Sequence, residues 1–231
     1  MPTNHPHLLK RIPYTNNLHQ STQELYAVGV SSGLGTVDGN LCKDVLQDVK
    51  QQRKYADKTL YKSIHNPNGR HDFFLKLEGA GKHLVKQVLS FWKHNQSPLY
   101  QPDAKLIEYA CFISLPGNEG QEIHCDTQDP IQHKDAISFG IPLQDTTPSM
   151  GPLVVTPNDG ADFLSIPVKR GQIYGWSQIV PHGGGANLSN TDRYVLYFTI
   201  VYPPVLDIDV GGQYSLHPDY KNGILLKQFN S

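Results

Sequence analysis

The sequence has little of what several classes of protein depend on. Its 3 cysteines, Cys42, Cys111 and Cys125, lack the number and spacing of a disulfide framework, a zinc site or a redox motif. The 20 basic residues nearly balance the 21 acidic ones and form no basic run, which argues against a nucleic-acid partner. No apolar stretch approaches the roughly 18–20 residues of a membrane span, and the first residues show no signal-peptide pattern. We therefore expect reduced thiols, a cytoplasmic location and no membrane contact.

Length and composition favour a single globular domain over residues 1–231. A chain of this length supports one sizeable core, and its 38% hydrophobic and 18% charged residues are ordinary for such a domain. The residue composition and the pattern of apolar residues change along the chain. We predict a helical and loop region over residues 1–104, a β-rich core over 105–205 and a C-terminal extension over 206–231.

The first hundred residues predict two helices. The opening stretch, rich in Asn, His, Pro and Ser, reads as loop with short strands such as residues 24–30. Apolar residues at helical spacing predict a helix within residues 38–64, capped by Asp38 or Asn40. A second helix is predicted over residues 79–95. Its apolar stripe consists of Leu84, Val85, Val88, Leu89 and Trp92.

From residue 105 onward the pattern changes to short strands rich in β-branched and aromatic residues. Turn-forming residues separate these strands, and no helix-length pattern interrupts them. Such a series is typical of a sandwich or barrel, of which the jelly roll is one version. The predicted class is therefore mainly β with flanking helices (α+β). The strands are expected at residues 105–115, 135–143, 151–157, 171–176 and 192–203.

A His-x-Asp pattern occurs twice, at His124 and Asp126 and again at His133 and Asp135. Residues two apart on a strand point to the same side, so either pair could bind one metal ion. A third ligand is available in His182, which precedes three glycines where the backbone can bend or be approached closely. Two histidines and one carboxylate leave coordination positions open, which suits non-haem Fe(II) and oxygen activation.

Each of these features has a simpler interpretation. A chain with 11 histidines produces His-x-Asp pairs by chance, and most such pairs are solvated. Asp135 resembles a turn residue that opens the following strand. Three consecutive glycines alone would be no more than a turn. The residues by themselves leave open whether either pair binds a metal.

Arg193 adds a reason to expect an anionic ligand. It lies 11 residues beyond His182, at the start of a strand that reads as buried. An unpaired buried charge is costly, so its guanidinium needs an anionic partner. The planar fork matches a carboxylate in two parallel hydrogen bonds. A ligand that chelates a metal at one end and carries a carboxylate at the other, such as 2-oxoglutarate, meets both demands. The alternative is a salt bridge to Asp192 or another acid.

Three stretches together resemble the phytanoyl-CoA-dioxygenase-like family of Fe(II)/2-oxoglutarate-dependent oxygenases. "IHCD" is similar to the family's His-x-Asp. "IPLQDTTPSMGPLVVTPNDG" is similar to its strand, acidic turn and "NGpL-v-PGSH" segment. "KRGQIYGWSQIVPHGGGANLSNTDR" is similar to its Gly-Asp strand followed by His-Gly-Ser-Gly-x-Asn-x-Ser and an arginine. The gaps of 56 residues from Asp126 to His182 and 11 to Arg193 also agree. The likeness covers roughly residues 106–202.

The chain also departs from the family pattern. "PND" replaces the usual Gly-Ser-His, Gln172 stands where Asp is frequent, and Cys125 stands where glutamine is common. These changes bear on substrate contacts more than on the metal. An aspartate at position 126 also argues against the halogenating members, which leave that coordination position to the halide.

The resemblance selects one of the two pairs and implies a fold and an activity. In the family the ligand pair precedes the next core strand by a dozen or more residues, which fits His124 and Asp126. It implies a double-stranded β-helix (jelly roll) core with N-terminal helices. Fe(II) would be bound by this pair and His182. 2-Oxoglutarate would complete the site as co-substrate with O2, its distal carboxylate held by Arg193 with help from a hydroxyl such as that of Tyr109.

The implied reaction is hydroxylation of an unactivated C–H bond with release of succinate and CO2. The metal and co-substrate carry the chemistry, while the protein orients and shields them. We expect a small-molecule substrate. Two alternatives stay open, namely a hydroxylase of a protein or peptide side chain and a non-catalytic jelly roll that binds a metal or another ligand.

Overall fold

The computed structural model describes residues 10–11, 15–57, 60–62, 69–156, 164–166, 169–205, 207–209 and 214–230. The described helices are α1 (Leu18–Val28), α2 (Gly39–Tyr55) and α3 (Gly79–His94), with short 3₁₀ turns η2 (Pro148–Met150), η3 (Pro218–Tyr220) and η4 (Leu226–Asn230). The strands are β1 (Lys10–Arg11), β2 (Val30–Ser31), β3 (Tyr61–Lys62), β4 (Arg70–Phe74), β5 (Lys105–Ser114), β6 (Ala136–Pro142), β7 (Leu153–Val155), β8 (Leu164–Ser165), β9 (Tyr174–Ser177), β10 (His182–Gly184), β11 (Arg193–Val201) and β12 (Ile224–Leu225).

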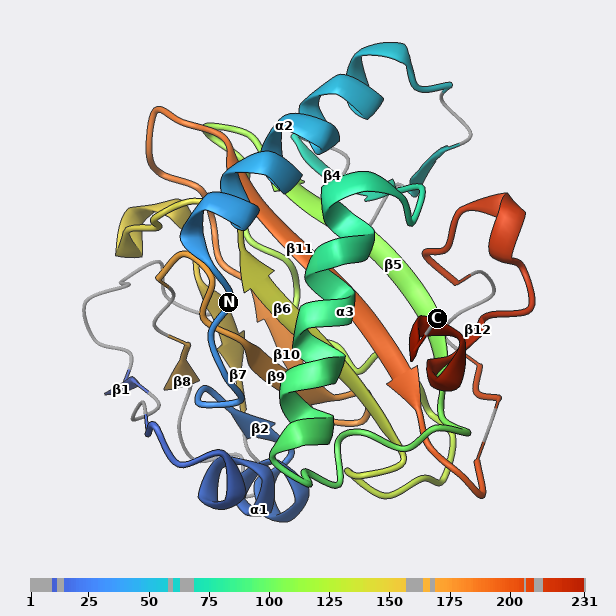
Figure 1. The fold of residues 1–231 in the computed structure, drawn as a ribbon. Helices are drawn as coiled ribbons and strands as arrows, with labels where there is room; N and C mark the ends of the chain where they lie inside the picture. Colours follow the sequence, from blue (N-terminus) through green and yellow to red (C-terminus); the bar gives the residue numbers. More distant parts are fainter. Residues whose placement is uncertain are drawn as a thin grey trace.

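Two sheets form the framework (Figure 1). In the large sheet the strand order is β2-β9-β6-β11-β5-β4-β3, and β12 pairs with one end of β5. In the small sheet the order is β1-β8-β7-β10. Among the described strands every pairing is antiparallel except that of β1 with β8. The described part of the chain is thus mainly antiparallel β with three α-helices, and its two sheets do not join into a closed barrel.

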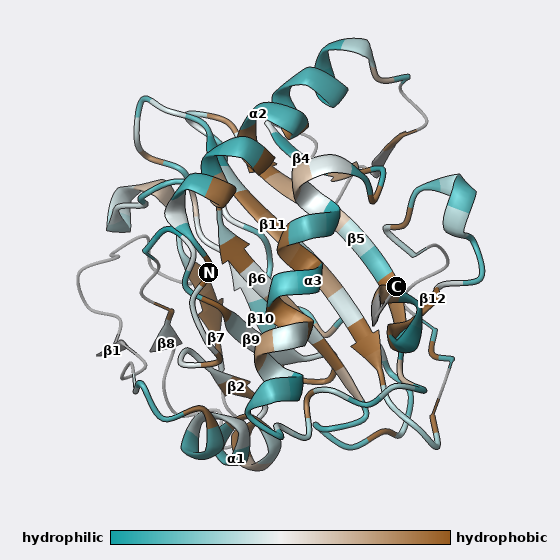
Figure 2. Ribbon diagram, viewed as in Figure 1, coloured by the Kyte–Doolittle hydropathy of each residue, from teal (hydrophilic) through white to brown (hydrophobic). Residues whose placement is uncertain are grey.

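Helices α2 and α3 lie across one face of the large sheet, and α1 lies at one end beside β2 (Figure 1). Strand β11 beneath α3 is largely hydrophobic (Figure 2), and buried apolar residues of all three helices belong to one cluster with it. The predicted stripe on α3 is confirmed, because Leu84, Val88 and Trp92 are fully buried in the main hydrophobic cluster. The Trp92 ring contacts those of Phe139 and Phe198, and its Nε1 donates to the Leu34 carbonyl at 2.8 Å. A buried indole N–H needs such a partner. The stripe therefore supports the sheet from outside. In the described part of the chain, no helix is long and apolar enough to cross a membrane.

The helix predicted within residues 38–64 is α2, which starts where expected but ends early. The Asp38 carboxylate accepts from the Asn40 amide at 2.6 Å, so Asp38 is the N-cap. The helix ends at Tyr55, earlier than the predicted range of 38–64, and Ala56 is extended. The last residue that α2 buries is Val49. Without a further apolar anchor, the helix has no packing to continue it.

One predicted strand is wrong. Residues 24–30 were expected to be extended because of their Tyr and Val residues, but they form the end of α1 and the start of β2. Asn17 caps this helix by accepting from the Gln20 amide at 3.1 Å, and Gly29 ends it with a φ of 83°. Leu25 is fully buried. Caps at both ends and one buried anchor outweigh the β-propensity of this stretch.

The strand positions in the predicted β-rich core, residues 105–205, agree better with the prediction. Strands β5, β6, β7, β9 and β11 each overlap one of the five predicted stretches. Several strands were not predicted, and β10 and β4 are the two among them that bear on the site. β10 begins at His182 and includes two glycines, and β4 lies in the N-terminal region expected to be helix and loop. β4 pairs with β5, so that region extends the large sheet as well as covering it.

Candidate metal centre and its cavity

The large sheet places polar side chains on the face that lies opposite the helices. In β11, Tyr194, Leu196 and Phe198 belong to the helix-side cluster. Because strand residues alternate faces, Arg193, Tyr197 and Thr199 point the other way. The partner strands follow the same alternation. A cavity lies on this inner face, and its walls also include the small sheet and the 121–126 segment.

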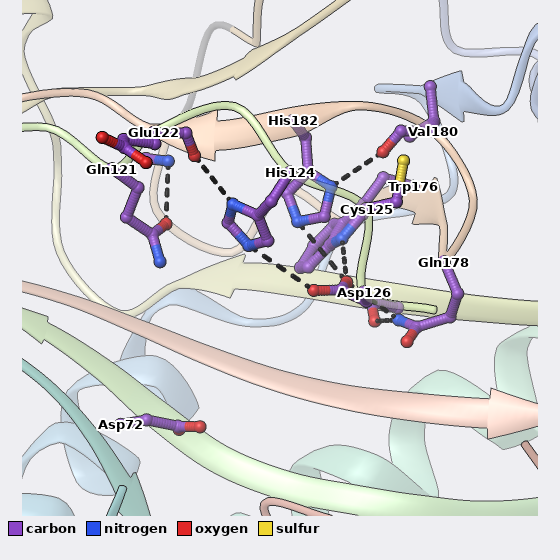
Figure 3. Close-up of polar contacts among 12 residues, drawn as sticks. Asp72, Gln121, Glu122, His124, Cys125, Asp126, Trp176, Gln178, Val180 and His182 are labelled. Carbon is purple, nitrogen blue, oxygen red and sulfur yellow. Dashed lines mark hydrogen bonds and ion pairs between the residues drawn. The ribbon is translucent and has the colours of Figure 1, made fainter. Parts of the chain in front are cut away.

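The three predicted metal ligands come together at this cavity. His124 and His182 form a two-way backbone bridge, with N···O distances of 2.9 and 2.8 Å. The Asp126 amide donates to the Gln178 carbonyl at 2.9 Å, which brings its carboxylate under both imidazoles. One ligand atom from each residue lies within 4.8 Å of the other two. Figure 3 shows both rings turned toward the Asp126 carboxylate.

Backbone contacts fix which ring nitrogen each histidine presents. His124 Nδ1 donates to the Glu122 carbonyl at 2.8 Å, and His182 Nδ1 donates to the Val180 carbonyl at 2.9 Å (Figure 3). A proton held at Nδ1 leaves the Nε2 lone pair free for a metal. Both Nε2 atoms face Asp126, at 3.7 Å from Oδ1 for His124 and 3.4 Å from Oδ2 for His182.

The Asp126 carboxylate is also held from the other side. Trp176 Nε1 and Gln178 Nε2 each donate to its Oδ2 at 3.2 Å. Hydrogen bonds of this kind orient a ligating carboxylate and stabilise its charge. The Trp176 ring lies 5.6 Å from that of His182, so it also packs against the second imidazole. Neither residue was among the predicted site residues.

Electrostatics at the site favour neutral imidazole, the form that binds metal. Burial lowers the pKa of His124, and the neighbouring His182 lowers it further. The Glu122 carbonyl and the Asp126 carboxylate act in the opposite direction with smaller effect. At neutral pH His124 is therefore already in the neutral form that can bind a metal.

The second His-x-Asp pair has a structural role. Asp135 accepts from the Gln132 amide at 2.7 Å, and its own carbonyl accepts from the Tyr202 amide at 2.8 Å. The ring of His133 packs against Gly29, where an added methyl group would lie 2.8 Å from it. Within the described part of the chain, the residues able to hold a metal are His124, Asp126 and His182. The turn interpretation of Asp135 is supported.

Arg193 lies on the inner face at the start of β11, 4% exposed. Its Nη2 donates to Ser114 Oγ at 3.2 Å, and its Nε has no hydrogen-bond partner among the described residues. Asp192, the salt-bridge alternative, instead lies 3.6 Å from Arg53. Burial lowers the pKa of Arg193, and the adjacent Tyr174 hydroxyl partly offsets this. Arg193 is thus a buried cation without a paired carboxylate, although it does not itself line the cavity.

Tyr109 does not belong with the candidates for co-substrate binding. It pairs in register with Phe198, on the helix side of the sheet, whereas Arg193 pairs with Ser114 on the inner side. Its hydroxyl points at α3, where a methyl group on Gly81 would lie 2.1 Å from it. Tyr109 and Ser114 lie five positions apart on β5, and this odd spacing places their side chains on opposite faces. The hydroxyl that contacts Arg193 is that of Ser114, at 3.2 Å.

The sequence analysis did not identify a series of buried, hydrogen-bonded polar side chains that starts at the metal ligand Asp126. Gln178 Nε2 also donates to Ser138 Oγ, and Ser138 shares a 2.7 Å hydrogen bond with Thr199. Thr199 donates to Glu108 Oε2 at 2.7 Å, and the Ser215 amide donates to its Oε1 at 3.1 Å. Such networks rigidify a site to the extent that their members are satisfied, and here Gln178 Oε1 has no partner among the described residues.

A second buried carboxylate lies across the cavity from the metal ligands (Figure 3). Asp72 of β4 accepts from the Tyr197 hydroxyl at 2.7 Å and from the Ser215 hydroxyl. Ser215 belongs to the predicted C-terminal extension, so that segment contributes to the cavity wall. The available signal was the i, i+2 spacing of Arg70 and Asp72 in "RHDFF", which is compatible with a strand that has one polar buried face.

Comparisons with known proteins show the fold. No protein-family model matches the sequence, and no curated protein sequence matches it. Among solved structures, the non-heme alpha ketoglutarate dependent epimerase SnoN from nogalamycin biosynthesis aligns with a TM-score of 0.68 at 12% identity, over 90% of this chain and 98% of that one. AviO1 from Streptomyces viridochromogenes Tue57 gives 0.66 at 13% identity, over 84% and 99%. The non-heme monooxygenase ThoJ gives 0.59 at 14%, over 81% and 78%.

These neighbours support the coarse class of the prediction. SnoN and ThoJ are non-heme enzymes by name, and one SnoN structure contains Fe3+ and alpha ketoglutarate. The chain therefore has a fold used by non-heme, 2-oxoglutarate-dependent enzymes, with a His-Asp-His group that could bind a metal. Membership of the phytanoyl-CoA-dioxygenase-like branch is not confirmed, because no family model matches.

Proposed function

We propose that this protein is an Fe(II)/2-oxoglutarate-dependent dioxygenase that hydroxylates an unactivated C–H bond of a small molecule. The observation that carries the proposal is the geometry of His124, Asp126 and His182. Their ligand atoms lie within 4.8 Å of one another, and both imidazoles are tied through Nδ1 so that Nε2 is free. Two histidines and one carboxylate on one side of a metal are the ligand set of non-haem iron oxygenases.

The fold fits this proposal. We interpret the small sheet and the central strands of the large sheet, β9, β6, β11 and β5, as the two halves of a double-stranded β-helix. The bridge between His124 and His182 extends the small sheet by one position. In this arrangement two ligands come from that bridge, and the co-substrate lies between the sheets. The similarity to SnoN and ThoJ supports the same arrangement.

The donor set suits iron and an anionic co-substrate. Iron would supply oxygen activation, and the balanced reaction is R–H + O2 + 2-oxoglutarate → R–OH + succinate + CO2. His124, Asp126 and His182 would hold the metal. Trp176 and Gln178 would keep the Asp126 carboxylate in place.

The interior charge also fits a dianionic co-substrate. Arg193 and Arg70 are 4% and 3% exposed, and no carboxylate of a described residue forms an ion pair with either. Buried cations are stable only when an anion compensates them. A carboxylate of 2-oxoglutarate would provide that compensation.

A turnover assay tests the proposal. Protein loaded with Fe(II) without oxygen is mixed with 2-oxoglutarate and O2, and succinate is measured with and without pools of candidate metabolites. We expect slow succinate release alone and faster release with the substrate, whose product is one oxygen atom heavier. Asp126→Ala serves as the control and should give none. Protein that binds iron but never forms succinate would instead be a metal-binding module.

Two other products would revise the finer part of the proposal. The likeness to the epimerase SnoN makes inversion of a stereocentre the second candidate. That reaction gives a product with the same mass as the substrate and a different retention time. Stimulation by peptides in place of metabolites would identify a hydroxylase of protein side chains.

A further inference from the structure

Two arginines flank one serine on the inner face of the large sheet. Ser114 of β5 pairs in register with Arg70 on one side and Arg193 on the other. Residues in register on neighbouring strands point to the same face, so all three side chains enter the interior. Only one of the two arginines, Arg70, lines the cavity that contains the metal ligands. Arg193 lies on the other side of Ser114 from Arg70 and donates to Ser114 Oγ.

The Arg70 guanidinium is buried without a matched partner. It is 3% exposed, and its Nε and Nη1 have no hydrogen-bond partner among the described residues. Its face lies over the Phe112 ring, 5.4 Å from the centroid. Burial and the nearby Arg193 lower its pKa to about 9, while Asp72 acts in the opposite direction. Arginine with such a pKa still carries its charge at neutral pH. An anion in the cavity would satisfy both the charge and the open donors.

A glycine makes room for this side chain beside the metal ligands. A methyl group on Gly184 would lie 1.9 Å from Arg70 Nη1 and 2.4 Å from Nη2, so the guanidinium packs against the bare backbone of β10. The Gly184 amide and carbonyl are both bonded to Gln121, at 2.9 and 2.8 Å, which fixes the backbone there. The family pattern that this chain resembles has serine in place of Gly184.

Gly184 also sets how far Arg70 lies from the metal. It follows His182 by two positions on the same strand, so their Cα atoms are roughly 6–7 Å apart and face the same side. A ligand that chelates a metal on His182 and extends along β10 would reach the guanidinium with its far end. This separation is comparable to the length of a five-carbon dicarboxylate.

We propose that Arg70, rather than Arg193, makes the direct contact with the distal carboxylate of 2-oxoglutarate, and that Gly184 is required to place it there. Arg193 acts as a positioning residue that holds Ser114 and adds positive charge on its other side. The inference rests on the proposed function, and it moves the anion contact from β11 to β4. The Arg70 fork can form two hydrogen bonds to one carboxylate.

Calorimetric titration of anaerobic, Mn(II)-loaded protein tests this contact. Two probes are used, 2-oxoglutarate and 2-oxobutyrate, the second of which lacks the distal carboxylate. Wild type should bind 2-oxoglutarate more tightly than 2-oxobutyrate, and Arg70→Gln should lower the ratio of the two affinities by at least about 30-fold. Arg193→Gln should lower it less, by under about tenfold. Arg170→Gln, whose arginine pairs with Asp145 at the surface, is the matched control and should change nothing. Mn(II) affinity should be the same in all four proteins.

Further variants separate a binding role from a structural one. Arg70→Lys keeps the charge and loses the fork, so its preference should fall between those of wild type and Arg70→Gln. Gly184→Ala leaves the arginine in the chain but pushes it from its place, and should also reduce the preference while Mn(II) still binds. The proposal is overturned if Arg193→Gln loses more preference than Arg70→Gln, or if Arg70→Gln keeps the wild-type preference. Wild type that binds Mn(II) but no 2-oxoglutarate would instead refute the proposed function itself.

Discussion

The two faces of strand β11, at the centre of the large sheet, are both buried but chemically different. On the helix side, β11 contributes Leu196 and Phe198 to a cluster with no ionised group. On the inner side the same strand contributes Arg193, Tyr197 and Thr199, all below 5% exposure. The polar groups there are stabilised by one another and by hydrogen bonds to carboxylates. One strand thus supplies the core on one face and the site on the other, so the two properties can be changed separately.

Substitution of a metal ligand should have the largest effect on metal binding. Asp126→Ala should lose Mn(II) binding, because one of three ligands is gone, and its melting temperature should not respond to Mn(II). Wild type at 100 times the dissociation constant should gain about 2.7 kcal/mol. Thermal unfolding with and without Mn(II) measures this.

Asp135→Ala is the matched control for Asp126→Ala. It removes the second His-x-Asp carboxylate and an acceptor for the Gln132 amide. We expect a lower melting temperature without metal and an unchanged shift on adding Mn(II). Loss of the shift in both variants would mean that the second pair also takes part in metal binding.

A substitution on the helix side of the sheet should change the stability of the protein but not its binding of Mn(II). Leu196→Ala leaves a cavity in the main cluster and should lower the free energy of unfolding by about 2–5 kcal/mol. Urea unfolding measures the loss. The Mn(II)-induced shift in melting temperature should persist, because Leu196 points away from the ligands. A folded Leu196→Ala variant that no longer binds Mn(II) would show that the faces are coupled.

The polar chain on the inner side should give an intermediate effect. Thr199→Val keeps the shape of the side chain but removes the donor to Glu108 and the link to Ser138. The loss of one hydrogen bond to a buried carboxylate should lower the free energy of unfolding by about 1–3 kcal/mol, which urea unfolding can detect. Val195→Ala, on the same face but apolar, is a useful comparison. An unchanged stability of Thr199→Val would indicate that the network is not fully dry.

The smallest effect is expected at the helix cap. Asp38→Ala removes the acceptor for the Asn40 amide at the start of α2 and should cost about 1 kcal/mol. Asp44→Ala, an exposed position inside the same helix, should cost less. Neither variant should alter the affinity for Mn(II) or 2-oxoglutarate. A cost at Asp38 no larger than that at Asp44 would remove the assigned role of this cap.

The difference between the two faces also explains what could be predicted from sequence. His124, Asp126 and His182 were predictable because the ligand pair is a local pattern and the third ligand has a fixed spacing to Arg193. The stripe on α3 was predictable because helical periodicity reports a single buried face. In β11 both faces are buried, so alternation does not show which residues enter the cavity.

The remaining errors come from long-range contacts at Tyr109 and Arg70 and from local helix caps at residues 24–30. Tyr109 was expected to help bind 2-oxoglutarate, but the face on which it lies depends on strand pairing, which cannot be read from the sequence. Arg70 was missed because its place next to Gly184 depends on contact between the two sheets. Residues 24–30 became helical because Asn17 and Gly29 provide caps on either side. Each error concerns contacts between residues that are distant in sequence or a local cap, and none concerns composition.

The central claim is that a metal bound by His124, Asp126 and His182 is the anchor for 2-oxoglutarate. Calorimetric titration of 2-oxoglutarate into wild-type protein under argon, once with Mn(II) and once with a chelator, tests it most directly. The account predicts one 2-oxoglutarate bound per chain with Mn(II), and no measurable binding with the chelator or in Asp126→Ala. Binding of equal strength with and without metal, or no binding to protein shown to contain Mn(II), would contradict it.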